Sequence, residues 1–333
     1  MYTDYYKLRA EPFLLTPDER FYFESSVHAQ AMAHLIYGLK RGEGFIVITG
    51  DVGAGKTTLV KRLIAKIDPN KVVAAHVVTT MLSGHDLLRM VAAALGLRDL
   101  PADKSGVLLR LQNFFEATHR QGRRALLIVD EAQNLSESAL EELRMLSNIQ
   151  VGHSAPFQSF LVGQPQFRRL IASPDLEQLR QRVIASYHLG PLNVSESGEY
   201  LMHRLRQVGW TDDPTFELGA IEALHWHTGG IPRRINTLGN RLMMLGFLDE
   251  LHRFTRDDVN RVAADLAGEI NGADDTDGVS IADLPIGAND TAPNSLTSRL
   301  SGIEQRLAQQ ETFMRRAGSF IQDFFNTRGS GAN

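Results

Sequence analysis

Residues 50–58, GDVGAGKTT, place glycines, one lysine and two threonines directly after the apolar run FIVIT at 45–49. Glycines let successive backbone N–H groups point at an anion, and a helix that follows offers its positive end to phosphate. This spacing is the Walker A pattern of a phosphate-binding loop in its strand–loop–helix context. The sequence therefore predicts a nucleotide site formed by Gly50, Asp51, Val52, Gly53, Ala54, Gly55, Lys56, Thr57 and Thr58.

A second group of reactive side chains follows the apolar run ALLIV at 125–129, where Asp130 and Glu131 are adjacent. Lys56 is expected to reach the β- and γ-phosphates, and the Thr57 hydroxyl is expected to bind Mg²⁺ together with Asp130. Glu131 is expected to polarise a water molecule for attack on the γ-phosphate. Two adjacent carboxylates at this place favour hydrolysis over simple binding, so ATP and Mg²⁺ are the expected cofactors.

Three later segments carry further candidates for the same reaction. Gln164, in SFLVGQP, is expected between the γ-phosphate and the attacking water, and Arg233, in GGIPRRIN, could sense the γ-phosphate. In LEQLRQRVIASYHLGPL, Arg180 and Arg182 precede a predicted strand, where an arginine of one subunit could reach the nucleotide of its neighbour. Such an arginine neutralises charge that develops on the γ-phosphate. Both remain candidates, with Arg182 preferred.

The elements that must position these residues alternate between short apolar runs and helical patterns. This alternation predicts an α/β fold, a P-loop NTPase parallel sheet between two layers of helices. The expected strands are 45–49, 72–78, 125–129, 157–162 and 186–189, and two of the helices between them are 84–97 and 105–120. From Asn193 the pattern is purely helical, with helices near 195–208, 215–228, 232–250 and from 255.

The last part of the chain changes composition. Residues 268–295 are rich in Asp, Gly, Asn, Ser and Pro, which is typical of a disordered linker. Apolar residues then follow an alternating spacing of four and three, which predicts a coiled-coil or amphipathic helix. The predicted organisation is a nucleotide-binding domain with an N-terminal adenine-side segment at 1–192, a helical lid at 193–267, the linker at 268–295 and the helix at 296–327.

These motifs in this order, with a helical lid after the sheet, resemble the AAA+ ATPases. The segments YYKLRAEPFLLTPDERFYFESSVHAQ, DEAQNLSESALEELRMLSNIQ and LRQRVIASYHLGPL are similar to the general secretion pathway protein A (ExeA-like) family, and within it to the ATPases associated with exosortase (PEP-CTERM) and exopolysaccharide systems. The resemblance extends from residue 1 to about residue 267. It implies an oligomeric ATPase, in a ring or filament, that supports envelope secretion or exopolysaccharide export.

The resemblance also implies that the adenine lies near residues 5–28, with Tyr5, Tyr6, Pro12, Phe13 and His28 as candidates, of which Tyr6, Phe13 and His28 are preferred. Aromatic rings suit a flat base through stacking. Members anchored in the membrane carry a transmembrane helix and a peptidoglycan-binding domain, and neither pattern occurs here. The helix at 296–327 is interpreted as a self-association or docking element, and a peripheral membrane contact is the alternative.

Composition limits the other function classes. The chain has 333 residues, 35 Lys and Arg against 39 Asp and Glu, and a formal net charge of −4, so bulk charge does not favour nucleic acid. Arg123 and Arg124 are interpreted as a solvated strand entry. The absence of cysteine excludes disulfides and thiolate chemistry. A cytoplasmic location is expected, with the inner membrane as a peripheral alternative. The alternative functions are a DNA-assembling regulator of transposition or replication and a non-catalytic, nucleotide-gated scaffold.

Overall fold

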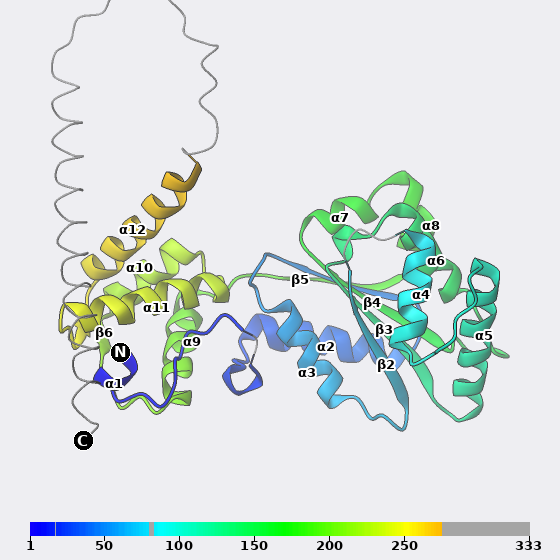
Figure 1. Ribbon diagram of the computed structural model, residues 1–333, viewed down its shortest axis with the longest axis horizontal. Coiled ribbons are helices and arrows are strands. Elements are labelled where there is room, and N and C mark those ends of the chain that lie inside the picture. The colour runs from blue at the N-terminus through cyan, green and yellow to red at the C-terminus, as the bar shows by residue number, and fades with distance from the viewer. Residues whose placement is uncertain (17, 80–82, 275–333) are drawn as a thin grey trace, which may run out of the picture. The chain divides into compact units, whose positions relative to one another are not determined.

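The computed structural model describes residues 1–16, 18–79 and 83–274, and Met1–Asp274 form one compact unit (Figure 1). Most of the predicted linker and the whole helix predicted at 296–327 lie outside the described residues, so both stay predictions. Within the described residues, no helix is both long and apolar enough to cross a lipid bilayer.

Five parallel strands form the central sheet, and all five correspond to strands predicted from the sequence. They are β1 Phe45–Gly50, β2 Val72–Val78, β3 Arg124–Asp130, β4 Phe157–Gly163 and β5 Val183–Leu189. Their order in the sheet is β2-β3-β4-β1-β5, and every neighbouring pair is parallel. All carboxyl ends therefore meet at one edge, where ligands of open α/β sheets bind.

Helices cover both faces of this sheet because its central strands are apolar on both sides (Figure 1). Phe45 and Val47 of β1 pack in one core with α4 (Gly84–Ala94), α5 (Lys104–Arg120) and α6 (Glu137–Ser147). The alternate residues Ile46 and Ile48 pack on the other face with α2 (Ser26–Arg41) and α3 (Lys56–Lys66). Two short helices, α7 (Gln166–Ile171) and α8 (Glu177–Arg180), lie between β4 and β5.

The lid consists of four helices: α9 Val194–Gln207, α10 Leu218–Thr228, α11 Pro232–Leu248 and α12 Arg256–Asp274. Pro232 occupies the first turn of α11, where its missing N–H has no helical partner to bond. A capping box begins α12, because Asp258 accepts from the Thr255 amide at 2.9 Å and its own amide donates to the Thr255 hydroxyl at 3.4 Å.

The prediction that this region is purely helical is wrong at one place. Two short strands, β6 (Thr215–Phe216) and β7 (Arg253–Phe254), pair in parallel, so the helix expected from 215 begins at Leu218. The rings of Phe216 and Phe254 lie 5.1 Å apart and join this pair to the lid core. Two-residue strands are too short to produce a periodic pattern in the sequence. In addition, α12 continues to Asp274, beyond the predicted linker start at 268.

The N-terminal segment begins with α1 (Tyr2–Tyr5) and packs in the core of the lid, although the sequence assigned it to the α/β domain. The Tyr2 hydroxyl donates to Asn240 Oδ1 at 2.8 Å, and the Tyr6 hydroxyl donates to the carbonyl of Leu251 at 2.7 Å. After the short 3₁₀ turn at Glu19–Phe21, the chain enters α2 on the sheet. The first residues of the chain therefore stabilise the lid.

Candidate nucleotide-binding site

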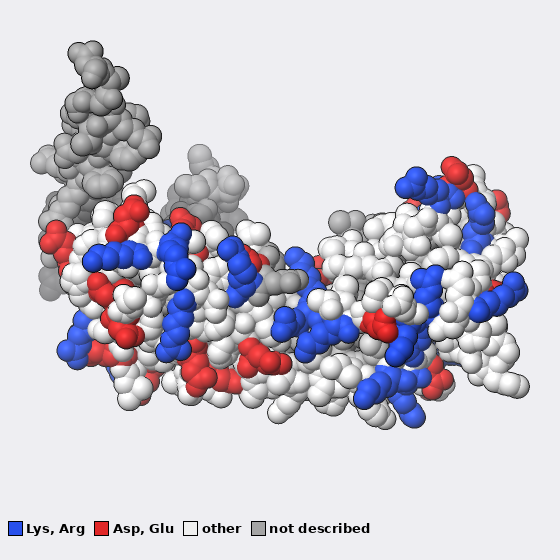
Figure 2. Space-filling view, turned by 90° about the horizontal axis from the view of Figure 1, so that it is seen from below, with Lys and Arg blue, Asp and Glu red and all other residues white. Residues whose placement is uncertain are grey.

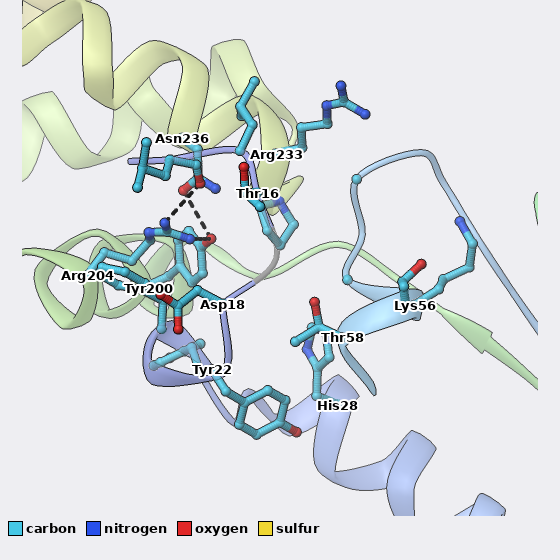
Figure 3. Close-up of a pocket in the computed structure, with 18 of the residues that line it drawn as sticks. Thr16, Asp18, Tyr22, His28, Lys56, Thr58, Tyr200, Arg204, Arg233 and Asn236 are labelled. Carbon is cyan, nitrogen blue, oxygen red and sulfur yellow. Dashed lines mark hydrogen bonds between the residues drawn. The ribbon is translucent and has the colours of Figure 1, made fainter. Parts of the chain in front are cut away.

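A cavity lies at the carboxyl edge of the sheet, where the loop after β1 faces the lid (Figure 3). His28, Lys56 and Thr58 lie on one side of it, and Tyr200, Arg204 and Asn236 lie on the other (Figure 3). Its remaining walls come from the N-terminal segment, the phosphate loop, the end of β3, the segment after β5 and the start of α11. They are formed by Leu14, Leu15, Thr16, Asp18, Phe21, Tyr22, Phe23, Val52, Gly53, Gly55, Thr57, Glu131, Leu192, Pro232 and Arg233.

The loop at 50–58 has the backbone that a phosphate site needs. Gly53 and Gly55 have φ angles of +85° and +96°, a region that favours glycine. A Cβ atom at Gly53 would lie 2.3 Å from Arg233 Cβ, and one at Gly55 would lie 2.7 Å from His28 Nε2. The next residue, Lys56, begins α3, whose free N–H groups and dipole favour an anion. These observations fit the phosphates of a nucleotide.

Lys56 is buried beneath this loop. Its ammonium donates to the carbonyls of Gly50 at 2.8 Å and Asp51 at 2.9 Å. Burial lowers the pKa of Lys56, and the carboxylates of Glu131, Asp130 and Asp51 oppose that shift. A phosphate beside Lys56 would add further negative charge and so favour the ammonium form. Among the other loop residues, Asp51 and Val52 are exposed and Ala54 is buried.

Thr57 and Asp130 lie together, as the sequence predicts for Mg²⁺ ligands. The Thr57 hydroxyl donates to Asp130 Oδ2 at 2.8 Å, and the Glu131 amide donates to Asp130 Oδ1 at 3.0 Å. Asp130 is 2% exposed, which is rare for a carboxylate unless it is paired or binds metal. Hydroxyl and carboxylate oxygens are hard donors that suit Mg²⁺, so these two residues would hold the cation.

Glu131 has a strained backbone and a firmly held side chain. Its φ angle is +56°, which costs about 1–3 kcal/mol for a residue other than glycine. Glu131 Oε2 accepts from Gln133 Nε2 at 2.5 Å and from Gln164 Nε2 at 3.2 Å. Its other oxygen, Oε1, accepts no hydrogen bond from any residue that the structure describes. One carboxylate oxygen is thus fixed, and the other can accept a hydrogen bond from water.

Two residues of this group were not predicted from the sequence. Gln133 Oε1 accepts from the backbone amide of Gln164 at 2.9 Å, so Gln133 connects β4 to Glu131. Thr79, at the end of β2, places its hydroxyl 3.0 Å from the Asp130 carbonyl and 2.8 Å from the Glu131 carbonyl. Gln133 could have been found from the sequence, because it lies two positions after Glu131. Thr79 could not, because neighbouring strands of a sheet can be far apart in sequence.

Of the residues expected near the adenine, His28 lines the cavity and also supports the loop. Its Nδ1 lies 2.7 Å from the Ser25 hydroxyl, and its Nε2 lies 3.1 Å from the carbonyl of Ala54. Burial lowers the pKa of His28, and the Ala54 carbonyl and Glu196 oppose the shift. A neutral ring that donates from Nε2 and accepts at Nδ1 satisfies both contacts.

Tyr6 and Phe13 occupy different places from those expected. Both are buried in the lid core, at 2% and 3% exposure, and neither lines the cavity. Phe13 packs flat against Gly239 of α11, where a Cβ would lie 3.2 Å from the ring. The aromatic residues that do reach the cavity from this segment are Phe21, Tyr22 and Phe23. Tyr6 and Phe13 therefore act through packing of the lid, which the sequence pattern could not distinguish from base stacking.

Arg204 holds the N-terminal segment against the cavity wall. It is buried, and its guanidinium donates to the carbonyls of Pro12 at 2.5 Å and Leu14 at 3.0 Å. It also donates to the Tyr200 hydroxyl at 3.2 Å, which in turn donates to Asn236 Oδ1 at 3.0 Å (Figure 3). In the part of the chain that the structure describes, Arg204 forms no ion pair. Backbone carbonyls and aromatic faces satisfy this cation instead.

Arg233 contacts the phosphate loop through its backbone, and its role in sensing the γ-phosphate stays a prediction. Its backbone amide donates to the carbonyl of Gly53 at 3.2 Å, and its side chain lines the cavity. The amide is one of the orphan donors at the start of α11. The lid and the loop therefore share a backbone hydrogen bond at the site.

Arg180 and Arg182 lie at the opposite edge of the sheet. Val183, at the start of β5, pairs with Phe45, whereas Leu189 pairs with Gly50 at the phosphate loop. The strand between these ends spans roughly 20 Å at about 3.3 Å per residue. Arg182 Nη1 lies 3.1 Å from the carbonyl of Ser147 at the end of α6. Neither arginine reaches the nucleotide site of its own chain.

The sheet order, with a Walker A loop after β1, an acidic pair after β3 and a helical lid above them, is that of the P-loop NTPase fold. A family model described as an AAA domain matches residues 39–171. The chain is 35% identical over 272 residues to the General secretion pathway protein A of Aeromonas hydrophila. That match covers 80% of this chain and 49% of the relative, so the chain spans about half the length of the curated protein it matches.

Solved structures agree on the fold. The chain is similar to the Aeropyrum pernix ORC2 protein in its ADPNP–ADP complexes, with a TM-score of 0.55, 19% identity and coverage of 76% of this chain and 71% of that chain. It is also similar to CDC6P from Pyrobaculum aerophilum, with a TM-score of 0.56, 15% identity and coverage of 81% and 75%. At these identities the likeness concerns the fold alone.

Replacement of Lys56 tests the phosphate site. Lys56→Ala should weaken ATP binding about 10- to 100-fold, because a hydrogen bond to a charged group contributes roughly 1.5–3 kcal/mol. Isothermal titration with ATP measures the change. Lys61→Ala, an exposed lysine on the same helix, is the matched control and should bind ATP normally. Unchanged affinity of Lys56→Ala would remove the loop from the nucleotide site.

Proposed function

We propose that the protein is an oligomeric ATPase that hydrolyses Mg-ATP in the service of envelope secretion. The observation that supports hydrolysis is the geometry of Glu131. Hydrogen bonds from Gln133 and Gln164 hold its side chain beside the Thr57–Asp130 pair. A site built only to bind nucleotide has no need for a strained backbone that aims a second carboxylate into the cavity.

Each residue of the site has a separate role in phosphoryl transfer. Lys56 and the backbone amides of the loop bind the phosphates, and Arg233 approaches from the lid. Mg²⁺ held by Thr57 and Asp130 would neutralise charge on the β- and γ-phosphate oxygens. Glu131 accepts a hydrogen bond from the attacking water, and Gln164, which donates to Glu131 Oε2 at 3.2 Å, orients that water. Catalysis in this class depends on such positioning and on electrostatics.

The proposed cellular role rests on the similarity to General secretion pathway protein A. That similarity supports a role with secretion machinery, and the sequence features given above extend the proposal to exosortase-associated and exopolysaccharide export. The proposed location is the cytoplasm, where ATP is available, with contact to the inner membrane through partners or the helix predicted at 296–327. The partner that ATP hydrolysis remodels is part of the same proposal.

Self-association is proposed from the position of Arg180 and Arg182. Both are exposed beside β5, at the edge of the sheet away from their own phosphate loop. An arginine there contributes to hydrolysis only if a second copy brings its nucleotide to it. A ring or a filament provides that arrangement for every subunit, since a head-to-tail contact repeats until it closes or extends.

The role of Glu131 is tested by Glu131→Gln. We expect turnover to fall about 10²- to 10⁴-fold, the usual contribution of a general base, while ATP affinity is retained. ATP-bound oligomers should then accumulate, which light scattering after gel filtration can measure. Glu137→Gln, an exposed position on α6, is the control. If Glu131→Gln hydrolyses ATP at the normal rate, Glu131 is not the base.

Action between subunits is tested by mixing two inactive proteins. Arg182→Ala should lose ATPase activity because it lacks the arginine, and Lys56→Ala should lose most activity because it binds ATP weakly. In a mixture, Lys56→Ala supplies Arg182 to the intact nucleotide site of its neighbour, so part of the activity should return. Arg180→Ala serves as the comparison. An Arg182→Ala protein as active as the wild type would contradict this role.

A second candidate function, assembly on DNA, is favoured by one surface. Lys40, Arg41, Lys71 and Arg123 lie where α2 ends and where β2 and β3 begin, and we call them the basic edge. Arg124 donates to the carbonyl of Leu39, which brings the end of α2 beside the start of β3. Figure 2 shows Lys and Arg predominating over the α/β part of the face it presents, whereas both signs are mixed over the lid.

The basic edge is largely unneutralised. Lys71 lies 3.9 Å from Asp68, and the other three residues form no ion pair with any carboxylate that the structure describes. Arg123, interpreted from the sequence as a solvated strand entry, belongs to this group of cations. Phosphates of a DNA backbone would fit such a row of cations, whose binding depends strongly on salt.

Charge reversal tests this second candidate. If DNA binds at the basic edge, duplex DNA should stimulate ATP hydrolysis, and the Arg41→Glu, Arg123→Glu double variant should lose that stimulation while it keeps the basal rate. The Arg98→Glu, Arg110→Glu variant makes the same charge change at exposed arginines on or beside the helices α4 and α5. An ATPase rate that is indifferent to DNA would leave the secretion ATPase as the function.

A further inference from the structure

One buried polar atom beside the Mg²⁺ ligands has no role in the site described so far. His76 lies in β2, the edge strand of the sheet, with Ile128 of β3 as its register partner. Its Nε2 lies 4.0 Å from Asp130 Oδ2, the same oxygen that accepts from Thr57. The His76 side chain is 26% exposed, whereas that of Asp130 is 3% exposed.

His76 Nε2 itself is buried and has no hydrogen-bond partner among the described residues. Leaving a buried polar atom unsatisfied costs about 1–3 kcal/mol, so such an atom in a folded protein needs an explanation. The distance of 4.0 Å is too long for a direct hydrogen bond to Asp130. A polar separation of this size is commonly bridged by water.

The neighbouring oxygens indicate what kind of water would fit here. Asp130 Oδ2 and Thr57 Oγ1 are the two oxygens that fit Mg²⁺, and His76 faces the first of them. Magnesium keeps several waters when proteins bind it, and residues that hydrogen-bond the inner ligands or their waters tune the affinity of a metal site. Asp130 Oδ2 accepts a hydrogen bond from the Thr57 hydroxyl, and Oδ1 accepts one from the Glu131 amide. His76, from β2, is a further polar side chain near Oδ2.

We propose that His76 is a positioning residue of the Mg²⁺ site, which binds a water in the hydration shell of the cation and so fixes Asp130 Oδ2. The inference rests on the proposed function, because it requires that a divalent cation binds at Thr57 and Asp130. His76 does not coordinate the metal in this arrangement. It acts through Asp130 and through water.

The expected result is a specific loss of metal affinity. With Mn²⁺ as the probe and ADP bound, His76→Ala should bind the cation roughly 10-fold more weakly, the lower end of the effect of outer residues on metal sites. Electron paramagnetic resonance of free Mn²⁺ measures this without any turnover. ADP affinity in excess EDTA should be unchanged. His76→Gln, whose amide can also bind water, should remain close to the wild type and guards against misfolding of the alanine variant.

Two controls separate this inference from the function it rests on. His153→Ala removes an exposed histidine and should not change Mn²⁺ affinity. Thr57→Ala removes a proposed ligand and should lower that affinity strongly. If Thr57→Ala binds Mn²⁺ as the wild type does, the Mg²⁺ site itself is misplaced. If Thr57→Ala loses the metal and His76→Ala retains it fully, only the role of His76 is overturned.

The spin-echo spectrum of bound Mn²⁺ gives a second measurement. A nitrogen coupling of the size seen for a directly coordinated imidazole would contradict the outer position of His76. A spectrum without that direct coupling in the wild type, combined with weaker Mn²⁺ binding by His76→Ala, supports it.

Discussion

The hydrogen bond from Thr57 to Asp130, 2.8 Å long, joins the two halves of the nucleotide site. Thr57 belongs to the helix after β1, and Asp130 ends β3, which is separated from β1 by β4. The contact therefore crosses one intervening strand at the carboxyl edge of the sheet. It depends on the parallel register of all three strands, because a shift of one residue would turn Asp130 toward the other face.

Residues that follow a buried strand were the most predictable. The end of an apolar strand determines the position of Lys56, Thr57, Asp130 and Glu131. The carboxyl ends of parallel strands lie at one edge of the sheet, so these residues come together there. The contact of Gln164 with Glu131 follows from the same rule. The five strands themselves were predicted correctly because FIVIT and ALLIV are continuous apolar runs and VVAAHVV and FQSFLV are largely apolar, whereas the weaker β5 was recognised only in its second half.

Residues whose position depends on packing between distant segments were not predictable. The sequence around Tyr6 and Phe13 does not distinguish base stacking from core packing. Their positions depend on contacts with Leu251 and Gly239, which lie far along the chain. The same holds for Arg204, whose partners are carbonyls near residue 12. Thr79 and His76 come from a strand with no motif of its own, so only the register of β2 with β3 identifies them.

The packing of the first residues in the lid has a mechanical consequence. The chain passes between the lid and the sheet twice, once between Phe13 and Ser26 and again between Leu189 and Val194. A body attached at two separate points can rotate about the line that joins them and is restrained in other directions. Two covalent crossings therefore restrain separation of the lid from the sheet more than one crossing would. Cleavage of the chain at the N-terminal crossing would leave the lid attached covalently through the segment after β5 alone.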